Sequence, residues 1–402
     1  MTASYDPRMA LTRAGLSRRR FLRGAGYGAA ALTGGSLLAA CGTDPVEPPQ
    51  PEEQVAPDRS QQEKVVNFSN WPLYIDVAGK NEGKRPTLDA FTKQTGIEVD
   101  YSEDVNDNDE FFGKVRPQLQ AGQPIGRDLF VVTDWMAARM IRLGFVQQLD
   151  KANLPNADNL RSALQSPPFD PDRSFTLPWQ SGFAGLAYNA KVTGAVGSVE
   201  ELLTRADLKG KVTMLTEMRD TMGLTLLDMG KDPSDFTADD YAAAIDRVQK
   251  AVDSGQIRKF TGNEYAQDLA KGNIAACVAW SGDVIQLQFE DKNIKFVNPD
   301  AGVMLWSDNM MVPNKAAHKA NAEKLMNYYY DPAVAAELVA WVNYICPVEG
   351  AQEEMEKIDP ELADNPLIFP DQSTLAKTSV FKDLSAEEER TYTQAFQRVI
   401  GA

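Results

Sequence analysis

The sequence is poor in the residues and motifs that usually carry catalysis. Its 402 residues include one His and three Cys. The lone His318 argues against His-based triads, His-rich metal sites and zinc chemistry. The chain also lacks the GxGxxG, Walker, GxSxG and CxxC patterns, which mark dinucleotide, phosphate, serine-hydrolase and thiol chemistry. We therefore expect no enzyme, no cofactor and no metal site, and an exposed position for His318 at the start of a helix.

Basic residues are also scarce relative to acidic ones. The 41 Lys and Arg residues face 57 Asp and Glu residues, which gives a formal net charge of −16 at pH 7. Because phosphate contacts need a basic surface, this balance disfavours nucleic acid as a partner and favours cations. A hydrophobic fraction of 43% and an aromatic fraction of 9% are typical of a folded protein, and the length fits two globular units or one large one.

The first forty residues indicate export. Ser17–Arg23 has the twin-arginine pattern, Gly24–Ala40 is uncharged and rich in Gly and Ala, and Leu38-Ala39-Ala40-Cys41 is a lipobox. The apolar stretch is too short and glycine-rich for a permanent membrane span. We predict that residues 1–40 are a twin-arginine lipoprotein signal peptide and that acylated Cys41 anchors the chain on the outer face of the bacterial cytoplasmic membrane.

Residues 41–64 are predicted to be the lipidated Cys and a Pro-rich tether. Five Pro residues and no hydrophobic periodicity lie between Gly42 and Lys64, and such a composition favours extended, solvated backbone. Removal of residues 1–40, with six Arg and one Asp, would change the net charge from −16 to −21. The exported chain would therefore be more acidic than its precursor.

Two cysteines, Cys277 and Cys346, remain after the lipobox. An oxidising compartment permits a disulfide between them. Both lie in apolar, strand-like runs, where buried free thiols are the commoner outcome. Free thiols are therefore the expectation, with the disulfide as the alternative.

From Val65 onward, strand-like runs alternate with helical patterns. The strand-like runs are 65–69, 97–101, 128–132, 211–216, 274–280 and 304–313. The helical patterns are 87–94, 109–120, 135–143, 238–254, 320–330 and 332–342. This rhythm predicts an α/β protein with two lobes, in which helices cover mostly parallel strands. Ligand sites in such sheets lie beyond the carboxyl ends of the strands.

Aromatic and acidic residues gather where these strand-like runs end. The groups are Asn70-Trp71-Pro72-Leu73-Tyr74, Thr133-Asp134-Trp135, Glu217-Met218-Arg219-Asp220, Trp280-Ser281-Gly282-Asp283 and Trp306-Ser307-Asp308, with Tyr344 after a later helix. Two further tryptophans, Trp179 and Trp341, belong to none of these groups and are expected in the core.

In content and order, these groups resemble the motifs of the periplasmic spermidine/putrescine-binding proteins, which are polyamine receptors of ABC importers. The similarity runs from about Phe68 to Lys382. The family opens with an Asn-Trp-x-x-Tyr motif, and it has a Pro-Ser-x-Tyr segment, an acid-x-Arg-acid turn, a Trp-x-Gly-Asp turn, an aromatic-x-Asp pair and a late Tyr. The matching residues are Asn70, Trp71 and Tyr74; Val132–Trp135; Glu217, Arg219 and Asp220; Trp280–Asp283; Trp306 and Asp308; and Tyr344.

The resemblance implies a type II periplasmic-binding-protein fold, a two-lobed Venus flytrap with the ligand in a cleft between the lobes. Residues 65–180 and 305–345 would form lobe 1, and residues 181–304 and 346–402 would form lobe 2. The implied partners are a putrescine- or spermidine-like polyamine and the permease and ATPase of an importer, with no cofactor and a monomeric state. The implied ligand-binding residues are Trp71, Tyr74, Thr133, Trp135, Glu217, Asp220, Trp280, Asp283, Trp306, Asp308 and Tyr344.

These residue types suit a polyamine, which is a flexible methylene chain with several ammonium groups. Aromatic faces pack against methylenes and attract cations, and carboxylates must neutralise ammonium groups that are taken out of water. Asp283 and Asp308 are the expected principal anchors, with Glu217 or Asp220 toward the other end of the ligand. The hydroxyl of Thr133 would add a hydrogen bond.

Three residues depart from the family pattern. Leu73 stands where many members have an acidic or polar residue, and Pro72 removes a backbone donor. Lys382 falls near the position of a late ligand Gln, where a cation would repel a polyamine. These departures leave the particular ligand open.

Other interpretations also remain open. Each aromatic residue alone could be core packing, Glu217 and Asp220 could favour a helix N-terminus, and Asp283 could be an N-cap. The ligand could instead be an amino acid, an opine, another organic cation or a ferric ion, with Arg219 available for a carboxylate. Less favoured alternatives are a hydrolase with Glu217 and Asp220 as acid and base, and a purely structural lipoprotein.

Overall fold

The computed structural model describes residues 55–78, 83–105 and 108–401. The signal peptide, Cys41 and most of the tether therefore lie outside the described residues. Within the described part of the chain, no helix has the length and apolar character needed to cross a membrane.

Ten strands of the described chain form one mixed sheet. They are β1 (Val65–Asn70), β2 (Glu98–Glu103), β3 (Leu129–Thr133), β4 (Leu177–Asn189), β5 (Val212–Leu215), β6 (Ile257–Thr261), β7 (Ala276–Trp280), β8 (Ile294–Val297), β9 (Val303–Met311) and β10 (Thr378–Ser379). The main order is β2-β1-β3-β9-β4-β7-β5-β6, with β8 beside β4 and β10 beside β9. The outer strands pair in parallel, whereas β4 and β9 run antiparallel to each other and to β7 and β3.

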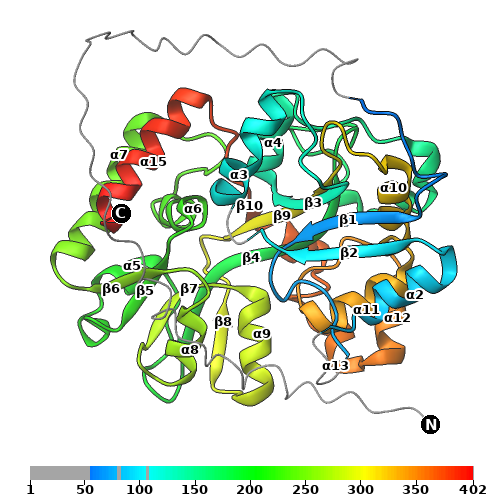
Figure 1. Ribbon diagram of the computed structural model, residues 1–402. Coiled ribbons are helices and arrows are strands. Elements are labelled where there is room, and N and C mark those ends of the chain that lie inside the picture. Colours follow the sequence, from blue (N-terminus) through cyan, green and yellow to red (C-terminus); the bar gives the residue numbers. More distant parts are fainter. Residues whose placement is uncertain (1–54, 79–82, 106–107, 402) are drawn as a thin grey trace, which may run out of the picture.

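The chain forms two lobes (Figure 1), and each lobe has a hydrophobic core of its own. The first lobe is built around β1, β2 and β3, and its core includes Phe68 and Trp179. The second lobe is built around β5, β6 and β7, and its core includes Met214 and Ala184. Because Trp179 and Ala184 both belong to β4, this strand passes from one core to the other. Strand β9 does the same, so two adjacent strands join the lobes.

Helices cover both faces of the sheet (Figure 1). They are α2 (Pro86–Thr95), α3 (Asn108–Gln120), α4 (Asp134–Arg142), α5 (Val199–Thr204), α6 (Met218–Asp228), α7 (Ala238–Asp253), α8 (Tyr265–Ala270), α9 (Ser281–Glu290), α10 (Lys319–Tyr329), α11 (Pro332–Val342), α12 (Ala351–Ile358), α13 (Pro360–Ala363), α14 (Gln372–Leu375) and α15 (Ala386–Ile400). Short 3₁₀ turns occupy parts of 151–164 and 206–208.

Local sequence signals set many helix ends. Helix α15 starts with a capping box between Ser385 and Glu388 and ends at Gly401 in the left-handed conformation. Such caps satisfy backbone groups that lack a partner within the helix. This helix lies beside α7 in the second lobe (Figure 1). The final segment of the chain is therefore anchored on the second lobe.

The segment Cys346–Phe369, which precedes α15, packs against the first lobe. The prediction placed all of residues 346–402 in lobe 2. The buried side chains from Cys346 to Phe369 belong instead to the core of the first lobe, whereas Leu384 to Val399 belong to that of the second. Helix α12 contacts α11, which holds it against the first lobe. Sequence order alone does not show that the chain packs on the first lobe before it reaches the second.

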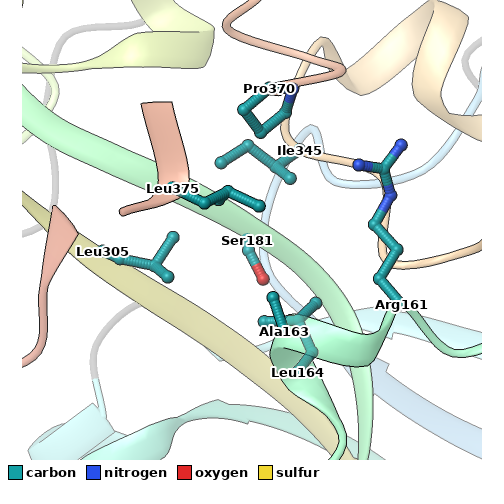
Figure 2. Close-up of a pocket in the computed structure, with 8 residues that line it drawn as sticks. All are labelled: Arg161, Ala163, Leu164, Ser181, Leu305, Ile345, Pro370 and Leu375. Atoms are coloured by element: carbon teal, nitrogen blue, oxygen red, sulfur yellow. The ribbon is translucent and has the colours of Figure 1, made fainter. Parts of the chain in front are cut away.

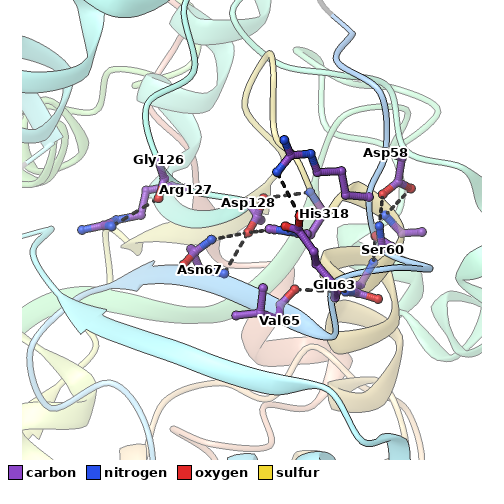
Figure 3. Close-up of polar contacts among 12 residues, drawn as sticks. Asp58, Ser60, Glu63, Val65, Asn67, Gly126, Arg127, Asp128 and His318 are labelled. Atoms are coloured by element: carbon purple, nitrogen blue, oxygen red, sulfur yellow. Dashed lines mark hydrogen bonds and ion pairs between the residues drawn. The ribbon is translucent and has the colours of Figure 1, made fainter.

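His318 is buried, with 5% of its surface exposed, so the prediction of an exposed residue is wrong. It does lie at the start of a helix, as the N-cap of α10. Its ring faces two carboxylates, with Nδ1 2.9 Å from Asp128 and Nε2 2.8 Å from Glu63 (Figure 3). Glu63 belongs to the predicted tether, so the end of that segment is docked on the first lobe. The carboxylate partners, which are remote in sequence, explain why a polar residue is buried here.

The cysteines agree with the expectation of free thiols. Cys277 lies in β7 and Cys346 follows α11, and both are buried and unpaired with each other. They belong to the cores of different lobes. Burial raises the pKa of the Cys346 thiol to about 11, which keeps it protonated and weakly reactive.

Candidate functional site

The predicted motif residues lie at junctions between strands and helices. Thr133 ends β3 and is the N-cap of α4. Trp280 ends β7 and is the N-cap of α9, and Glu217 follows β5 as the N-cap of α6. Each junction places its side chains at the carboxyl end of a strand. The sheet therefore delivers residues from both lobes to one region, as expected for an α/β protein.

Asp308 is at the centre of this region. It is 6% exposed and lies on β9, directly opposite Thr133 of β3. The Thr133 hydroxyl donates a hydrogen bond of 2.7 Å to the Asp308 carboxylate and accepts one of 2.9 Å from the Asn108 amide. Burial raises the pKa of Asp308 to about 7. Neutral donors thus position this carboxylate, and no Lys or Arg side chain of the described chain forms an ion pair with it.

Tyr74 places a second polar group beside Asp308. Its side chain is buried, and its hydroxyl lies close enough to Asp308 to donate a hydrogen bond to that carboxylate. Burial and the nearby Asp308 charge both raise the pKa of this phenol. The hydroxyl is therefore neutral, and within the described chain its oxygen accepts no hydrogen bond.

Asp220 supplies a carboxylate from the second lobe. It is 6% exposed, and it accepts a hydrogen bond of 2.7 Å from the indole nitrogen of Trp280. Burial, and then the neighbouring Glu217 charge, raise the pKa of Asp220 to about 8. Glu217 itself caps helix α6 by accepting from the backbone N–H of Arg219 at 3.2 Å. Glu217 and Asp220 thus both lie at the N-terminus of α6, as the helix-terminus alternative expected, and Asp220 also accepts from Trp280.

Asp283 is held by three donors. It accepts hydrogen bonds from Tyr265 at 2.7 Å, Asn263 at 2.9 Å and Tyr344 at 3.1 Å. It lies in the first turn of α9, whose N-cap is Trp280, so the N-cap alternative for Asp283 is not realised. Burial outweighs these hydrogen bonds and raises the pKa of Asp283.

Aromatic rings connect the carboxylates across the lobes. The Tyr344 ring meets those of Tyr74 and Trp306 edge to face, with centroid distances of 5.7 and 5.3 Å. Two glycines permit this packing. A Cβ atom at Gly182 would lie 2.4 Å from the Trp306 ring, and one at Gly282 would lie 2.5 Å from the Tyr344 ring. The rings therefore lie directly against backbone that a side chain would obstruct.

The remaining two predicted aromatics have other contacts. The Trp71 indole donates to the Val131 carbonyl at 3.1 Å and packs against the cores of the first lobe. The Trp135 ring is covered by Arg219, whose Cζ lies 3.9 Å from the ring centroid. The Trp135 indole nitrogen is buried without a hydrogen-bond partner within the described chain. Tyr74, Trp280, Trp306 and Tyr344 lie around the carboxylates.

Ion pairs close the outer side of this region. Glu389 of α15 contacts Arg139 of α4 at 2.6 Å and Arg219 of α6 at 2.8 Å. A more exposed pair, Arg142 with Asp383 at 2.9 Å, also links the two lobes. Arg219 is therefore engaged by Glu389 and Trp135, and it also lies 3.8 Å from the Glu217 carboxylate.

The structure shows where two of the departures from the family pattern lie. Leu73 is 69% exposed and has a left-handed backbone with φ of 59°. Lys382 donates to Glu388 at 2.9 Å and to the Phe236 carbonyl at 3.0 Å, and its ammonium lies 4.4 Å from the Phe236 ring centroid. These partners hold the Lys382 charge against α7 and α15 in the second lobe, away from the buried carboxylates.

The opposite face of the joining strands offers little space. Ser181 and Leu305 line a cavity of about 10 Å³ there, together with Ile345 and Leu375 (Figure 2). This is room for one water molecule. The face that carries Asp308 and Trp306 is the one that presents carboxylate and indole groups. Among the described residues, no group of three or more His, Cys, Asp or Glu side chains is placed to hold a metal ion.

Some residues of this region escaped sequence analysis. Asn108 and Tyr265 position Thr133 and Asp283, and Gln180 lies opposite Asp308 across β4 and β9. None belongs to a recognisable motif. The alternation of side chains along β4 could have placed Gln180 on the face of Gly182, but only the strand register pairs it with Asp308.

Comparisons with known proteins add to this geometry. Residues 87–370 match the model of a family described as bacterial extracellular solute-binding protein. The chain is 30% identical over 359 residues to the putrescine-binding periplasmic protein of Escherichia coli K12, which covers 84% of this chain and 92% of that protein. It is 24% identical to the spermidine/putrescine-binding periplasmic protein of the same organism, with 83% and 91% covered.

Solved structures share the fold. A putative spermidine/putrescine ABC transporter protein from Listeria monocytogenes superposes with a TM-score of 0.72 and 24% identity, over 84% of this chain and 99% of that one. The Tp0655 lipoprotein of Treponema pallidum gives 0.72 with 20% identity, over 84% and 100%. These similarities confirm the predicted two-lobed α/β fold.

Proposed function

The chain belongs to the bacterial extracellular solute-binding protein family, and we propose that the solute it binds is a polyamine. The predicted family is thus correct, and its members are binding proteins, not enzymes. In our proposal, a putrescine- or spermidine-like cation binds between the lobes and passes to the permease and ATPase of an ABC importer. The observation that carries the proposal is Asp308, a buried carboxylate held by neutral donors among aromatic rings.

The electrostatics support a cation. Asp220, Asp283 and Asp308 are all buried, and burial raises the pKa of each. Buried carboxylates of this kind are stabilised when a positive charge arrives, because it offsets the cost of their desolvation. Two or more ammonium groups on one chain could satisfy carboxylates from both lobes at once. Binding would then favour the closed arrangement.

The aromatic residues support a methylene chain between the charges. Trp280, Trp306 and Tyr344 lie among the three carboxylates. Their faces would pack against methylene groups and attract the adjacent ammonium groups, at about 0.5–2 kcal/mol for each desolvated cation–π contact. Trp71 and Trp135 would contribute as supports for these walls.

A solute with a carboxylate is less compatible with the region. Its natural partner would be Arg219, which is bonded to Glu389 and stacked on Trp135. Asp220 and Asp308 would repel such a group. Amino acids and opines are therefore the second choice as ligands.

Export and anchoring complete the proposal. The twin-arginine pattern before a lipobox supports export of the folded chain and acylation of Cys41. The protein would then work as a monomer on the outer face of the cytoplasmic membrane. Replacing Cys41 with Ser should release it into the soluble extracytoplasmic fraction, and replacing Arg18 and Arg19 with Lys should retain it inside the cell. Unchanged fractionation of either variant would contradict the corresponding step.

Calorimetric titration tests the ligand. The chain from Val55 onward should bind putrescine, spermidine or spermine with micromolar or tighter affinity, and the affinity should fall as salt rises. Arginine and glutamate serve as comparison ligands. The Asp308→Asn variant should bind the preferred polyamine far more weakly, because it removes the charge that compensates an ammonium. Binding of glutamate alone, or equal binding by Asp308→Asn, would refute the proposal.

A further inference from the structure

Gln180 is buried on the strand beside Asp308, and its amide oxygen is unpaired within the described chain. Its side chain is 2% exposed, and its Oε1 atom has no hydrogen-bond partner within the described chain. A buried amide oxygen that lacks a partner is costly, and such groups usually have a reason that lies outside the protein. By contrast, the buried amide of Gln256 donates to the Leu202 and Arg205 carbonyls at 2.8 and 3.0 Å.

The strand register brings Gln180 to the carboxylate. Gln180 of β4 is directly opposite Asp308 of β9, which is directly opposite Thr133 of β3. Directly opposed residues on neighbouring strands project from the same face of the sheet. The three side chains therefore form one row across three strands, with the carboxylate in the middle.

A local irregularity creates this register. The pairing of β4 with β9 shifts between Pro178 and Gln180, so Trp179 has no direct partner there. The Trp179 indole turns into the core of the first lobe and donates to the Tyr74 carbonyl at 3.2 Å. Without the extra residue, the next side chains of β4 would exchange faces. The bulge thus puts Gln180 on the face of Asp308.

Tyr74 completes the arrangement. Its hydroxyl lies close enough to Asp308 to donate to that carboxylate, which leaves the phenol oxygen as an acceptor. The row and this hydroxyl together offer three kinds of acceptor: a carboxylate, an amide oxygen and a phenol oxygen. An unsubstituted primary ammonium has three N–H donors on one nitrogen, which matches that number.

We propose that Gln180 is a specificity-determining residue that, with Asp308 and Tyr74, forms a subsite for an unsubstituted primary ammonium group. This inference rests on the proposed function, because it assigns one end of the polyamine to this subsite. A tertiary ammonium keeps one N–H and would leave two of the three acceptors unpaired. Leaving buried polar groups unpaired discriminates strongly between otherwise similar ligands.

The test compares two symmetrical diamines on three proteins. Putrescine and its tetramethylated analogue, which carries two methyl groups on each nitrogen, are titrated into the wild type, Gln180→Met and Gln256→Met. Gln180→Met should lose about tenfold in putrescine affinity, as expected for an acceptor to a charged group, and its preference for putrescine over the analogue should shrink. Its ligand-free melting temperature should equal or exceed that of the wild type. Gln256→Met should melt earlier and keep the preference.

The outcomes separate the two proposals. A wild type that binds neither these diamines nor a longer polyamine refutes the proposed function and this subsite with it. A wild type that binds putrescine, together with a Gln180→Met variant of unchanged preference, refutes the subsite alone. A Gln180→Met variant that only melts earlier, with equal losses for both diamines, would show that Gln180 is structural and would also overturn the subsite.

Discussion

Arg219 of the second lobe lies over the indole of Trp135 in the first lobe, with its Cζ 3.9 Å from the ring centroid. The same guanidinium contacts Glu389, which also contacts Arg139. The participants come from α4, α6 and α15, and they are 12–19% exposed. Protein groups alone therefore link the two lobes in this structure.

Replacing Glu389 with Gln should weaken this link between the lobes. The change removes the charge shared by Arg139 and Arg219, and it leaves two partly buried cations less compensated. We expect about a tenfold loss in polyamine affinity and, by small-angle scattering, a larger radius of gyration without ligand. Asp383→Asn is the matched control, because its pair with Arg142 is about half exposed and such pairs contribute about 0–1 kcal/mol. Equal effects of both variants would contradict the special role of Glu389.

Polyamine affinity should rise with pH between about pH 6 and pH 8. The pKa of Asp308 is raised to about 7 and that of Asp220 to about 8, so both bind protons that a cation must displace. Titrations in buffers of different ionisation enthalpy should detect proton release at pH 6. In Asp308→Asn, this release should diminish. A pH-independent affinity without proton release would contradict the assignment.

The same carboxyls should make the ligand-free protein less stable as pH rises. Their folded pKa values exceed the unfolded value of 3.8, so the folded state binds more protons than the unfolded state between these limits. The free energy of unfolding contributed by these groups therefore falls as pH rises through that interval. Bound polyamine should reverse the loss, and the ligand-induced rise in melting temperature should be larger at pH 8 than at about pH 5.5.

Tyr265→Phe should destabilise the second lobe and weaken ligand binding together. The Tyr265 hydroxyl donates to Asp283 at 2.7 Å and accepts from the Trp280 backbone N–H at 2.8 Å. Its loss leaves a buried carboxylate and a backbone donor short of a partner, at a cost of about 1–3 kcal/mol. Tyr241→Phe is the control, because that hydroxyl makes one bond to the Tyr392 carbonyl. Chemical denaturation and calorimetry would measure both effects.

His318 should stabilise the fold mainly at lower pH. Burial opposes protonation, but hydrogen bonds to Glu63 and Asp128 outweigh it and raise the pKa of His318. A raised pKa contributes stability that is complete below the unfolded value of 6.5 and disappears as pH rises through the folded value. The melting temperature of Glu63→Gln should therefore fall below that of the wild type at about pH 6 and approach it at about pH 9. The exposed Glu353→Gln variant provides the baseline.

Sequence patterns predicted the parts of this molecule that depend on neighbours in the chain. The alternation of strands and helices, and the clustering of residues such as Trp280 and Asp308 where strands end, follow from local periodicity. Burial of His318 and the role of Gln180 depend on partners 190 and 128 residues away, Asp128 and Asp308. The path of Cys346–Phe369 across the first lobe likewise depends on which core has space for it. Such relationships become visible only once the strands are in register.

The docking of residues 58–63 has a mechanical consequence. Ser60 accepts from the backbone N–H of Asn321 at 3.1 Å, and Glu63 reaches His318 (Figure 3). Any attachment upstream of Val55 is thereby joined to the first lobe and not to the second. On an anchored molecule, the first lobe would stay fixed relative to the membrane. The second lobe would move about a hinge formed by β4 and β9. A transport partner would then contact the first lobe at a nearly constant distance from the membrane. It would detect the bound solute through the movement of the second lobe.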